Sequence, residues 1–243
     1  EMQRSLVGSE MCIRDRDITV LSFSDSSMVD RNSSIIKVDS GWIVYSKNSE
    51  SSILSFTSDG QFSGYIGHRG NGPGEYTSVY DVVVNQKSKV LEVLSDGGIF
   101  CYTFGGDFLD KKEVTYPAFS FAIDDRQNYW FYVGNNTTYG DAKMICTDEN
   151  IANVAYYLHQ KSNMLPMVEN NFGRNGEWLT FHESLNHDLY TIENGKLDLS
   201  YAMDFPNYKL PKKLHELSGM EVIEELQRSN LSLIHISDPT RLR

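Results

Sequence analysis

The sequence predicts an all-β fold built from repeated units of about four short strands. Aromatic and β-branched residues recur in short alternating runs, which Gly, Asn, Asp and Ser interrupt. Turn-forming residues occur late in each group of runs: Gly60, Asp107, Asp148 and Asn194 are separated by 47, 41 and 46 residues. Four-stranded repeats of roughly 40–50 residues are typical of the blades of a β-propeller. A β-sandwich also has many short strands, but nothing in its architecture maintains such a period.

Four groups of runs are expected to form one blade each, over residues 34–76, 77–118, 119–165 and 172–208. Each blade has two apolar faces that it can bury only against its neighbours. In chain order, the expected strands are Ile35–Val38, Trp42–Tyr45, Ile53–Phe56 and a run around Tyr65; Val79–Val84, Val90–Leu94, Ile99–Phe104 and Phe108–Val114; Phe119–Ile123, Tyr129–Val133, Lys143–Thr147 and Asn153–Leu158; and a weak first strand, then Trp178–Phe181, Asp188–Ile192 and Leu197–Asp204.

A helical insertion is expected over residues 211–228, after the fourth blade. Ser218 and Glu221 have the spacing of a capping box, in which each side chain accepts the other residue's backbone N–H. Met220, Ile223 and Leu226 then form one apolar stripe. Because four blades do not close a small ring comfortably, we expect further blades in the natural protein.

Both ends of the chain are expected to be non-native. Leu6–Arg16 (LVGSEMCIRDR) and Leu231–Arg241 (LSLIHISDPTR) can be translated from the two strands of one DNA string, apart from Asp238, which a single base change explains. The string resembles a transposase adapter used in preparing sequencing libraries. We therefore assign residues 1–16 and 231–243 to the adapter and residues 17–230 to an internal propeller fragment.

The composition restricts the partners of the protein. A net charge of −11 repels phosphate backbones, and no Lys/Arg cluster offsets it, so we expect no nucleic-acid partner. No apolar run is long enough for a membrane helix. Outside the adapter, Cys101 and Cys146 lie in apolar strand-like runs and fit no zinc spacing, which favours buried free thiols.

The stretch Gly67–Tyr76 (GHRGNGPGEY) is the least ordinary part of the sequence. Its glycines and proline predict a tight irregular connection between the first two blades. YIGHRGNGPGEY, followed by VYDVVV, KVLEVL and IFCYTFGGDFL, resembles the Bacteroides-type six-bladed β-propeller proteins, which are similar to NHL and TolB propellers. The resemblance covers Thr19–Arg228. It implies a six-bladed ring, commonly made as an exported lipoprotein of the cell envelope, with two blades and the export signal absent from this fragment.

Two roles are open for this loop. Glu75-Tyr76 stands where a phosphate-binding loop needs Lys-Ser/Thr, and a strand follows, so nucleotide binding is not expected. The structural role is a rigid turn formed by Gly67, Gly70, Gly72, Pro73 and Gly74, in which Glu75 accepts freed backbone N–H groups. The functional role is a ligand-binding lip at one mouth of the propeller. Its candidate residues are His68, Arg69, Asn71 and Glu75.

The remaining motifs give no assembled catalytic or metal set. His182, Glu183 and His187 have the wrong spacing for a zinc protease helix. Tyr129, Trp130, Tyr132, Tyr139, Tyr156, Tyr157 and Trp178 could line a sugar- or peptide-binding face, although blade packing explains most aromatics. We expect no cofactor and no resident metal.

The sequence thus favours a non-enzymatic envelope propeller that binds a ligand, such as a glycan or a peptide, or a protein partner through loops at one mouth. One alternative is a propeller enzyme of the lactonase or lyase type. Such enzymes hold a metal in the central channel, where Asp81, Asp124 and His182 are the candidates. The other alternative is a structural scaffold in an envelope complex.

Overall fold

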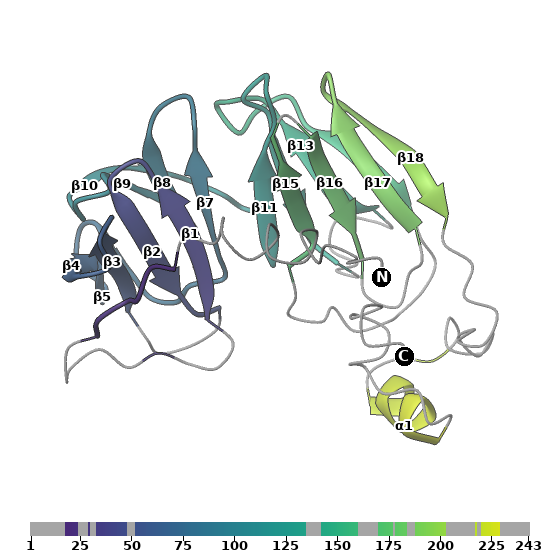
Figure 1. Cartoon of the computed structure of the whole chain (residues 1–243). Coiled ribbons are helices and arrows are strands. Elements are labelled where there is room, and N and C mark those ends of the chain that lie inside the picture. Colours follow the sequence, from purple (N-terminus) through teal and green to yellow (C-terminus); the bar gives the residue numbers. More distant parts are fainter. Residues whose placement is uncertain are drawn as a thin grey trace, which may run out of the picture.

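The computed structural model describes residues 18–23, 29, 33–47, 52–134, 142–159, 170–176, 178–183, 188–202, 217 and 220–228. It confirms the predicted all-β propeller, with four four-stranded sheets and a short helix near the C-terminus (Figure 1). The expected adapter segments, Tyr139, His187 and the helical residues 211–216, 218 and 219 lie outside the described residues. In the described part of the chain, no helix has the length and apolarity needed to span a membrane.

The first two sheets hold the strands expected for the first two blades. The first sheet contains β1 (Ser34–Val38), β2 (Gly41–Tyr45), β3 (Ile53–Thr57) and β4 (Phe62–Ile66); the second contains β7 (Asp81–Asn85), β8 (Val90–Ser95), β9 (Gly98–Tyr102) and β10 (Phe108–Lys112). Between them lie the two-residue strands β5 (His68–Arg69) and β6 (Glu75–Tyr76), which pair in parallel.

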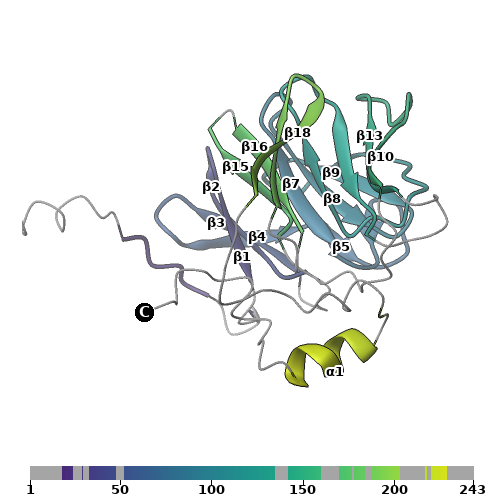
Figure 2. The same ribbon diagram turned by 90° about the vertical axis from the view of Figure 1, so that its right-hand side faces the viewer.

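The next two sheets follow the same plan. The third contains β11 (Ser120–Ile123), β12 (Tyr129–Tyr132), β13 (Ala142–Thr147) and β14 (Ala155–His159); the fourth contains β15 (Phe172–Asn175), β16 (Trp178–His182), β17 (Asp188–Glu193) and β18 (Lys196–Ala202). Helix α1 (Met220–Arg228) lies below the sheets in Figures 1 and 2.

Each four-stranded sheet is an antiparallel meander in which spatial order equals chain order. The repeat seen in the sequence has a structural counterpart: Gly60, Asp107, Asp148 and Asn194 all lie in turns between the third and fourth strands of their sheets. Gly60 and Asn194 adopt φ values of 89° and 55°, the left-handed region that Gly and Asn tolerate best. The period therefore marks the same turn in four successive blades.

Among the described residues, an apolar layer lies between each pair of consecutive four-stranded sheets, and a smaller cluster around Phe56 covers the other face of the first sheet. Ile43 and Ile53 of the first sheet pack with Val82 and Leu91 of the second. Ile99 packs with Phe121 across the next interface, and Trp130, Tyr132 and Met144 pack with Leu179 and Phe181 across the last one. All residues of β11, β12 and β13 are buried, because the third sheet has a neighbour on each face.

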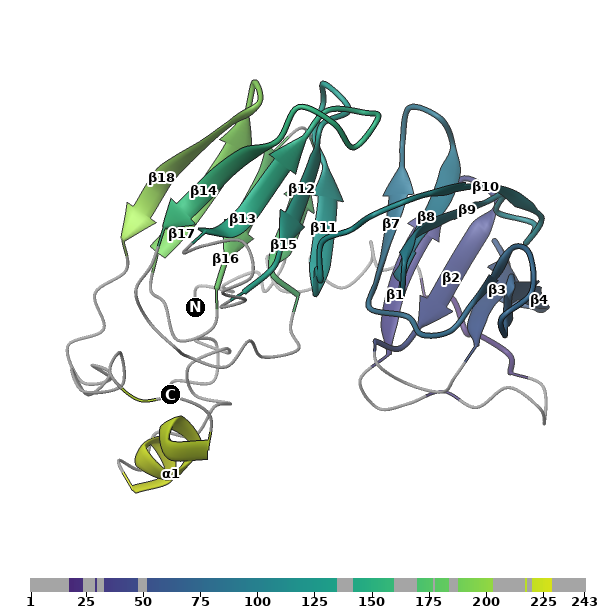
Figure 3. The same ribbon diagram turned by 180° about the vertical axis from the view of Figure 1, so that it is seen from behind.

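The first strands of neighbouring sheets lie side by side near the middle of the molecule. β7 and β11 stand next to each other both in Figure 1 and from behind in Figure 3, and β15 follows β11. The fourth strands lie at the outer edge, and β18 is largely exposed. This arrangement of inner and outer strands gives the sheets a central side.

Candidate functional site

A cavity of about 680 Å³ lies on the central side of the sheets. It is lined by residues from the first strand of every sheet. These include residues 34–37 of β1, 81–84 of β7, 121–123 of β11 and 172–174 of β15. A site shared by four repeats is positioned by the ring itself and not by any single blade.

The lining of this cavity includes a buried ion pair between the first two sheets. The Lys47 ammonium lies 2.8 Å from Asp81 Oδ1, and both side chains are about nine-tenths buried. Asp81 Oδ2 also accepts the backbone N–H of Phe121 at 3.1 Å, which links the second sheet to the third. Burial raises the pKa of Asp81, and the Lys47 charge opposes that rise. Asp81 is thus a structural anchor as well as a lining residue.

Two further cations line the cavity. The Arg174 side chain, on β15, donates to the Ile123 backbone oxygen. Lys37, on β1, stands over the Trp42 ring with its ammonium 5.2 Å from the ring centre. Among the described residues, neither cation has a carboxylate partner.

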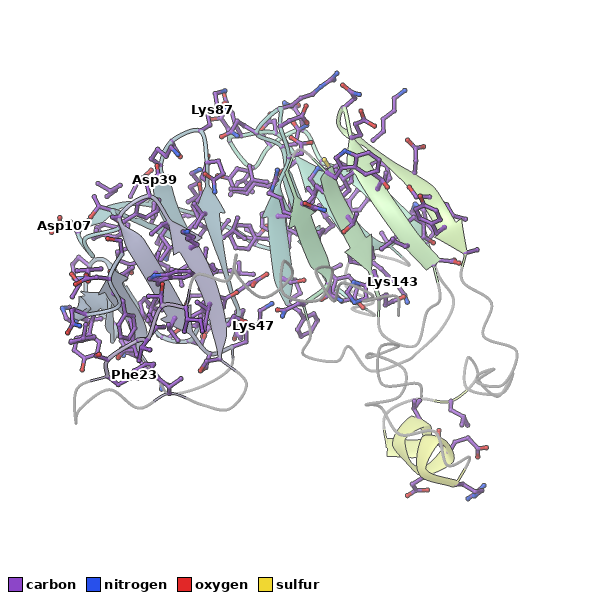
Figure 4. All side chains as sticks on the ribbon, viewed as in Figure 1. Phe23, Asp39, Lys47, Lys87, Asp107 and Lys143 are labelled. Carbon is purple, nitrogen blue, oxygen red and sulfur yellow. The ribbon has the colours of Figure 1, made fainter. Side chains whose placement is uncertain are left out.

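A second cavity of about 450 Å³ adjoins the first, since Gln86 and Arg174 line both. Its other lining residues come from β16, from β17 and from turns beside the strand ends, and include Asp125, Gly176, Trp178 and Glu193. Figure 4 shows Lys87, the neighbour of Gln86, at the opposite end of the sheets from Lys47. The second cavity therefore lies at one mouth of the central cavity, and we refer to it as the mouth cavity.

The Gly67–Tyr76 loop folds around the Glu75 carboxylate. Glu75 Oε2 accepts the Gly72 backbone N–H at 2.8 Å, and the Gly70 backbone N–H donates to the Tyr76 backbone oxygen at 3.0 Å. Arg69 Nε donates to the Thr77 backbone oxygen at 2.8 Å. These hydrogen bonds use the Glu75 carboxylate and the Arg69 Nε–H group to hold the loop together.

The same loop packs against the outer strands of the second sheet. The Tyr102 hydroxyl donates a hydrogen bond to the Gly74 backbone oxygen at 2.9 Å. Gly67 and Gly74 have φ values of 61° and 75°, and a Cβ atom on either would lie under 3 Å from Tyr102 or Phe108. Glycine is required there both for the backbone and for the close approach.

The structure places the four candidate lip residues away from the inner strands. His68, Arg69 and Asn71 are exposed, while Glu75 is half-buried. None of the four lines the central cavity or the mouth cavity. Any ligand bound by this loop would occupy the outer side of the first two sheets, beside β5 in Figure 1.

The three candidate metal ligands do not meet. Asp81 lines the central cavity, but Asp124 lies in the β11–β12 turn, where it accepts the Trp130 indole N–H at 3.0 Å and the Asn128 N–H at 2.9 Å. His182 ends β16. Within the part of the chain that the structure describes, no group of three His, Cys, Asp or Glu residues could hold a metal ion. Cys101 and Cys146 are free and buried in the second and third sheets.

The aromatic residues divide into core and surface. Tyr129, Trp130 and Tyr132 are buried between sheets, whereas 66% of Trp178 and 47% of Tyr156 are exposed. Sequence reasoning did not single out Lys37, Lys47 or Arg174. Only their places in the repeats could have marked them. Lys37 and Arg174 lie on the first strand of a repeat, and Lys47 follows the second strand of the first sheet.

Structural comparison shows the fold in other proteins. A Bacteroides fragilis protein described as exported has a TM-score of 0.69 and 14% identity, over 89% of this chain and 61% of its own. A Bacteroides vulgatus member of the DUF4221 family has a TM-score of 0.53 and 11% identity, over 86% and 68%. A streptogramin B lyase has a TM-score of 0.52 and 16% identity, over 75% and 58%. The chain thus spans about three-fifths of the B. fragilis protein and of the lyase.

Comparison with curated protein sequences gives no match. Residues 13–237 match the family described as Domain of unknown function (DUF4934). The chain therefore belongs to the DUF4934 family, and it has the β-propeller fold that it shares with the two Bacteroides proteins.

Proposed function

We propose that the protein is a non-enzymatic β-propeller of the cell envelope, which binds a ligand or a protein partner through one mouth of its ring. The observation that carries this proposal is the central cavity lined by all four sheets. Its volume of about 680 Å³ is in the range of roughly 300–1,000 Å³ found for small-molecule sites. It combines apolar walls with a few charged groups, as such sites do.

The proposed location rests on similarity. The B. fragilis neighbour is described as exported, and the Gly-rich loop resembles NHL- and TolB-like envelope propellers. We therefore propose that the natural protein is exported, as an envelope lipoprotein. Mass spectrometry of envelope and cytoplasmic fractions from the source bacterium tests this proposal, and recovery in the cytoplasm alone would contradict it.

The natural protein is proposed to have six blades, of which residues 17–230 supply four and a helical insertion. The span of about three-fifths of the B. fragilis protein and of the lyase supports this number. The family match contains residues 17–230 and extends a few residues into each flank. Sequencing the parent gene from unfragmented DNA tests the proposal. A genome that encodes residues 1–16 and 231–243 in frame would refute the adapter origin.

Binding is tested by screening the full chain against glycans, peptides and envelope extracts, with thermal shift as the first readout. We expect a ligand or partner that raises the melting temperature without being converted. Turnover of a substrate, with no such binder, would favour the lactonase or lyase alternative, and calcium or zinc retained by the purified protein would add to it. Co-purification with one fixed partner and no small ligand would favour the scaffold.

The proposed lip residues are tested in the same screen. His68→Ala and Asn71→Ala remove exposed side chains, so the fold should persist in both variants. Arg174→Gln alters the central cavity instead. Loss of binding in the first pair alone would place the site on the Gly-rich loop, and loss in the third alone would place it in the central cavity.

A further inference from the structure

We propose that the central cavity recognises an anionic group of its ligand, through Arg174 and Lys37. This inference deepens the binding function proposed above and rests on it. The ligand is a compact molecule that carries a carboxylate or a phosphate.

The first support is a contrast of charge. The protein as a whole carries a net charge of −11, yet the charged residues that line this cavity, within the part of the chain that the structure describes, are Lys37, Lys47, Arg174 and Asp81. The Lys47–Asp81 pair is closed at 2.8 Å and neutralises itself. Among the described lining residues two positive charges remain, so this cavity attracts anions, which the acidic protein as a whole repels.

The second support is the availability of both cations. An arginine has five N–H donors, and among the described residues the Arg174 guanidinium has one bonding partner, the Ile123 oxygen. Lys37 has a ring neighbour, Trp42, but no carboxylate partner within the described ranges. Both cations belong to strands that line the cavity, Lys37 to β1 and Arg174 to β15.

The third support is the character of the walls between these cations. Val82, Val83, Phe121 and Ile123 line the same cavity. Apolar walls lower the local dielectric constant, so an ion pair or charged hydrogen bond formed there is stronger than at an open surface. The planar guanidinium of Arg174 matches the two oxygens of a carboxylate or a phosphate, which it can bind through two parallel bonds.

Three sugars with one skeleton provide the test: glucose, glucuronate and glucose 6-phosphate. Calorimetric titration of the full chain at low salt should show binding of at least one of the two anions and none of glucose. The stronger of the two anions distinguishes a carboxylate ligand from a phosphate ligand. Affinity should fall as salt is raised, since screening weakens these charge interactions.

Variants of the two lining cations test whether the anion binds in the central cavity. Arg174→Gln and Lys37→Gln should each weaken binding roughly tenfold or more, because each removes a charge-assisted hydrogen bond. Lys87→Gln is the matched control, since Lys87 lies in the exposed β7–β8 turn outside the cavity lining, and it should bind as the parent does. Thermal melts establish that each variant is folded, and Lys37→Gln decides the matter if Arg174→Gln unfolds.

Failure of this inference can be told from failure of the proposed function. If glucose binds as tightly as the anions, or if neither cation variant weakens binding, recognition by charge is wrong although the cavity still binds ligands. If neither anion binds while the screen finds a neutral ligand, the same conclusion holds. If nothing binds in either experiment, both proposals are wrong.

Discussion

The Lys143 ammonium lies 2.5 Å from the Glu183 carboxylate, and the exposed fractions of the two side chains are 2% and 8%. Lys143 is on β13 of the third sheet, while Glu183 follows β16 of the fourth. Tyr132 donates its hydroxyl to the same Glu183 oxygen at 2.7 Å. The interface between these sheets thus contains a closed polar contact among its apolar residues.

Replacement of Lys143 by Met should destabilise the protein by about 3–5 kcal/mol, since it leaves the Glu183 charge buried without its cation. Lys89→Met is the matched control: Lys89 pairs with Asp39 at 2.9 Å, but the two side chains are 54% and 77% exposed. Its expected cost is about 0–1 kcal/mol. Denaturant unfolding measures both changes, and equal costs would show that the buried pair is not a structural contact.

The Gly-rich loop provides a second stability test. Gly74→Ala should cost about 1–3 kcal/mol, because φ at this position is 75° and the new Cβ would lie 2.6 Å from the Phe108 ring. Gly105→Ala should change the stability little, since its Cβ would have no neighbour nearer than 3.6 Å. Thermal melts of both variants decide the point, and a harmless Gly74→Ala would mean that the loop does not need glycine there.

The fold could be predicted from the sequence because it depends on local and repeated signals. Short apolar runs rich in aromatic and β-branched residues define strands such as β8 and β12, and turns like those at Gly60 and Asn194 occur once in each blade. Those signals do not depend on where the blades lie relative to one another. The packing of one blade on the next follows from the need of each sheet to cover its apolar faces.

The central site could not be predicted in the same way. Lys37 and Arg174 are separated by more than a hundred residues and line one cavity only because their strands occupy the same place in different repeats. Asp81 and Asp124 were equally plausible channel residues in the sequence, yet one lines the cavity and the other holds a turn together. Short polar residues serve turns as readily as sites, and only the tertiary structure distinguishes these uses.

The two described thiols should be unreactive in the folded protein. Burial raises the pKa of both Cys101 and Cys146 to about 12, and the thiolate is the reactive form. Iodoacetamide at pH 8 should therefore modify them only after unfolding, as mass spectrometry would show in a Cys12→Ser variant.

The same shifts predict a dependence of stability on pH. The unfolded thiols ionise near their ordinary pKa of 9.0, while the folded ones stay protonated to about pH 12. Their contribution to stability is complete below pH 9 and is lost as the pH rises from there towards 12. In Cys101→Ala/Cys146→Ala, the loss of stability over this pH window should be smaller than in the parent. An identical pH profile would assign the loss to other groups.

Trp178 reports whether a further blade covers the fourth sheet. Leu179 and Phe181 pack towards the third sheet, so Trp178, one position away on the same strand, faces the other side of the sheet. Of its side chain, 66% is exposed, whereas Trp130 is fully buried. In the present chain, iodide should quench Trp178 strongly, and the Trp178→Phe variant should lose most of the quenchable emission. In a gene product with further blades, the next sheet should cover Trp178 and protect it from iodide. Equal quenching in the short and long proteins would show that no blade packs on this face.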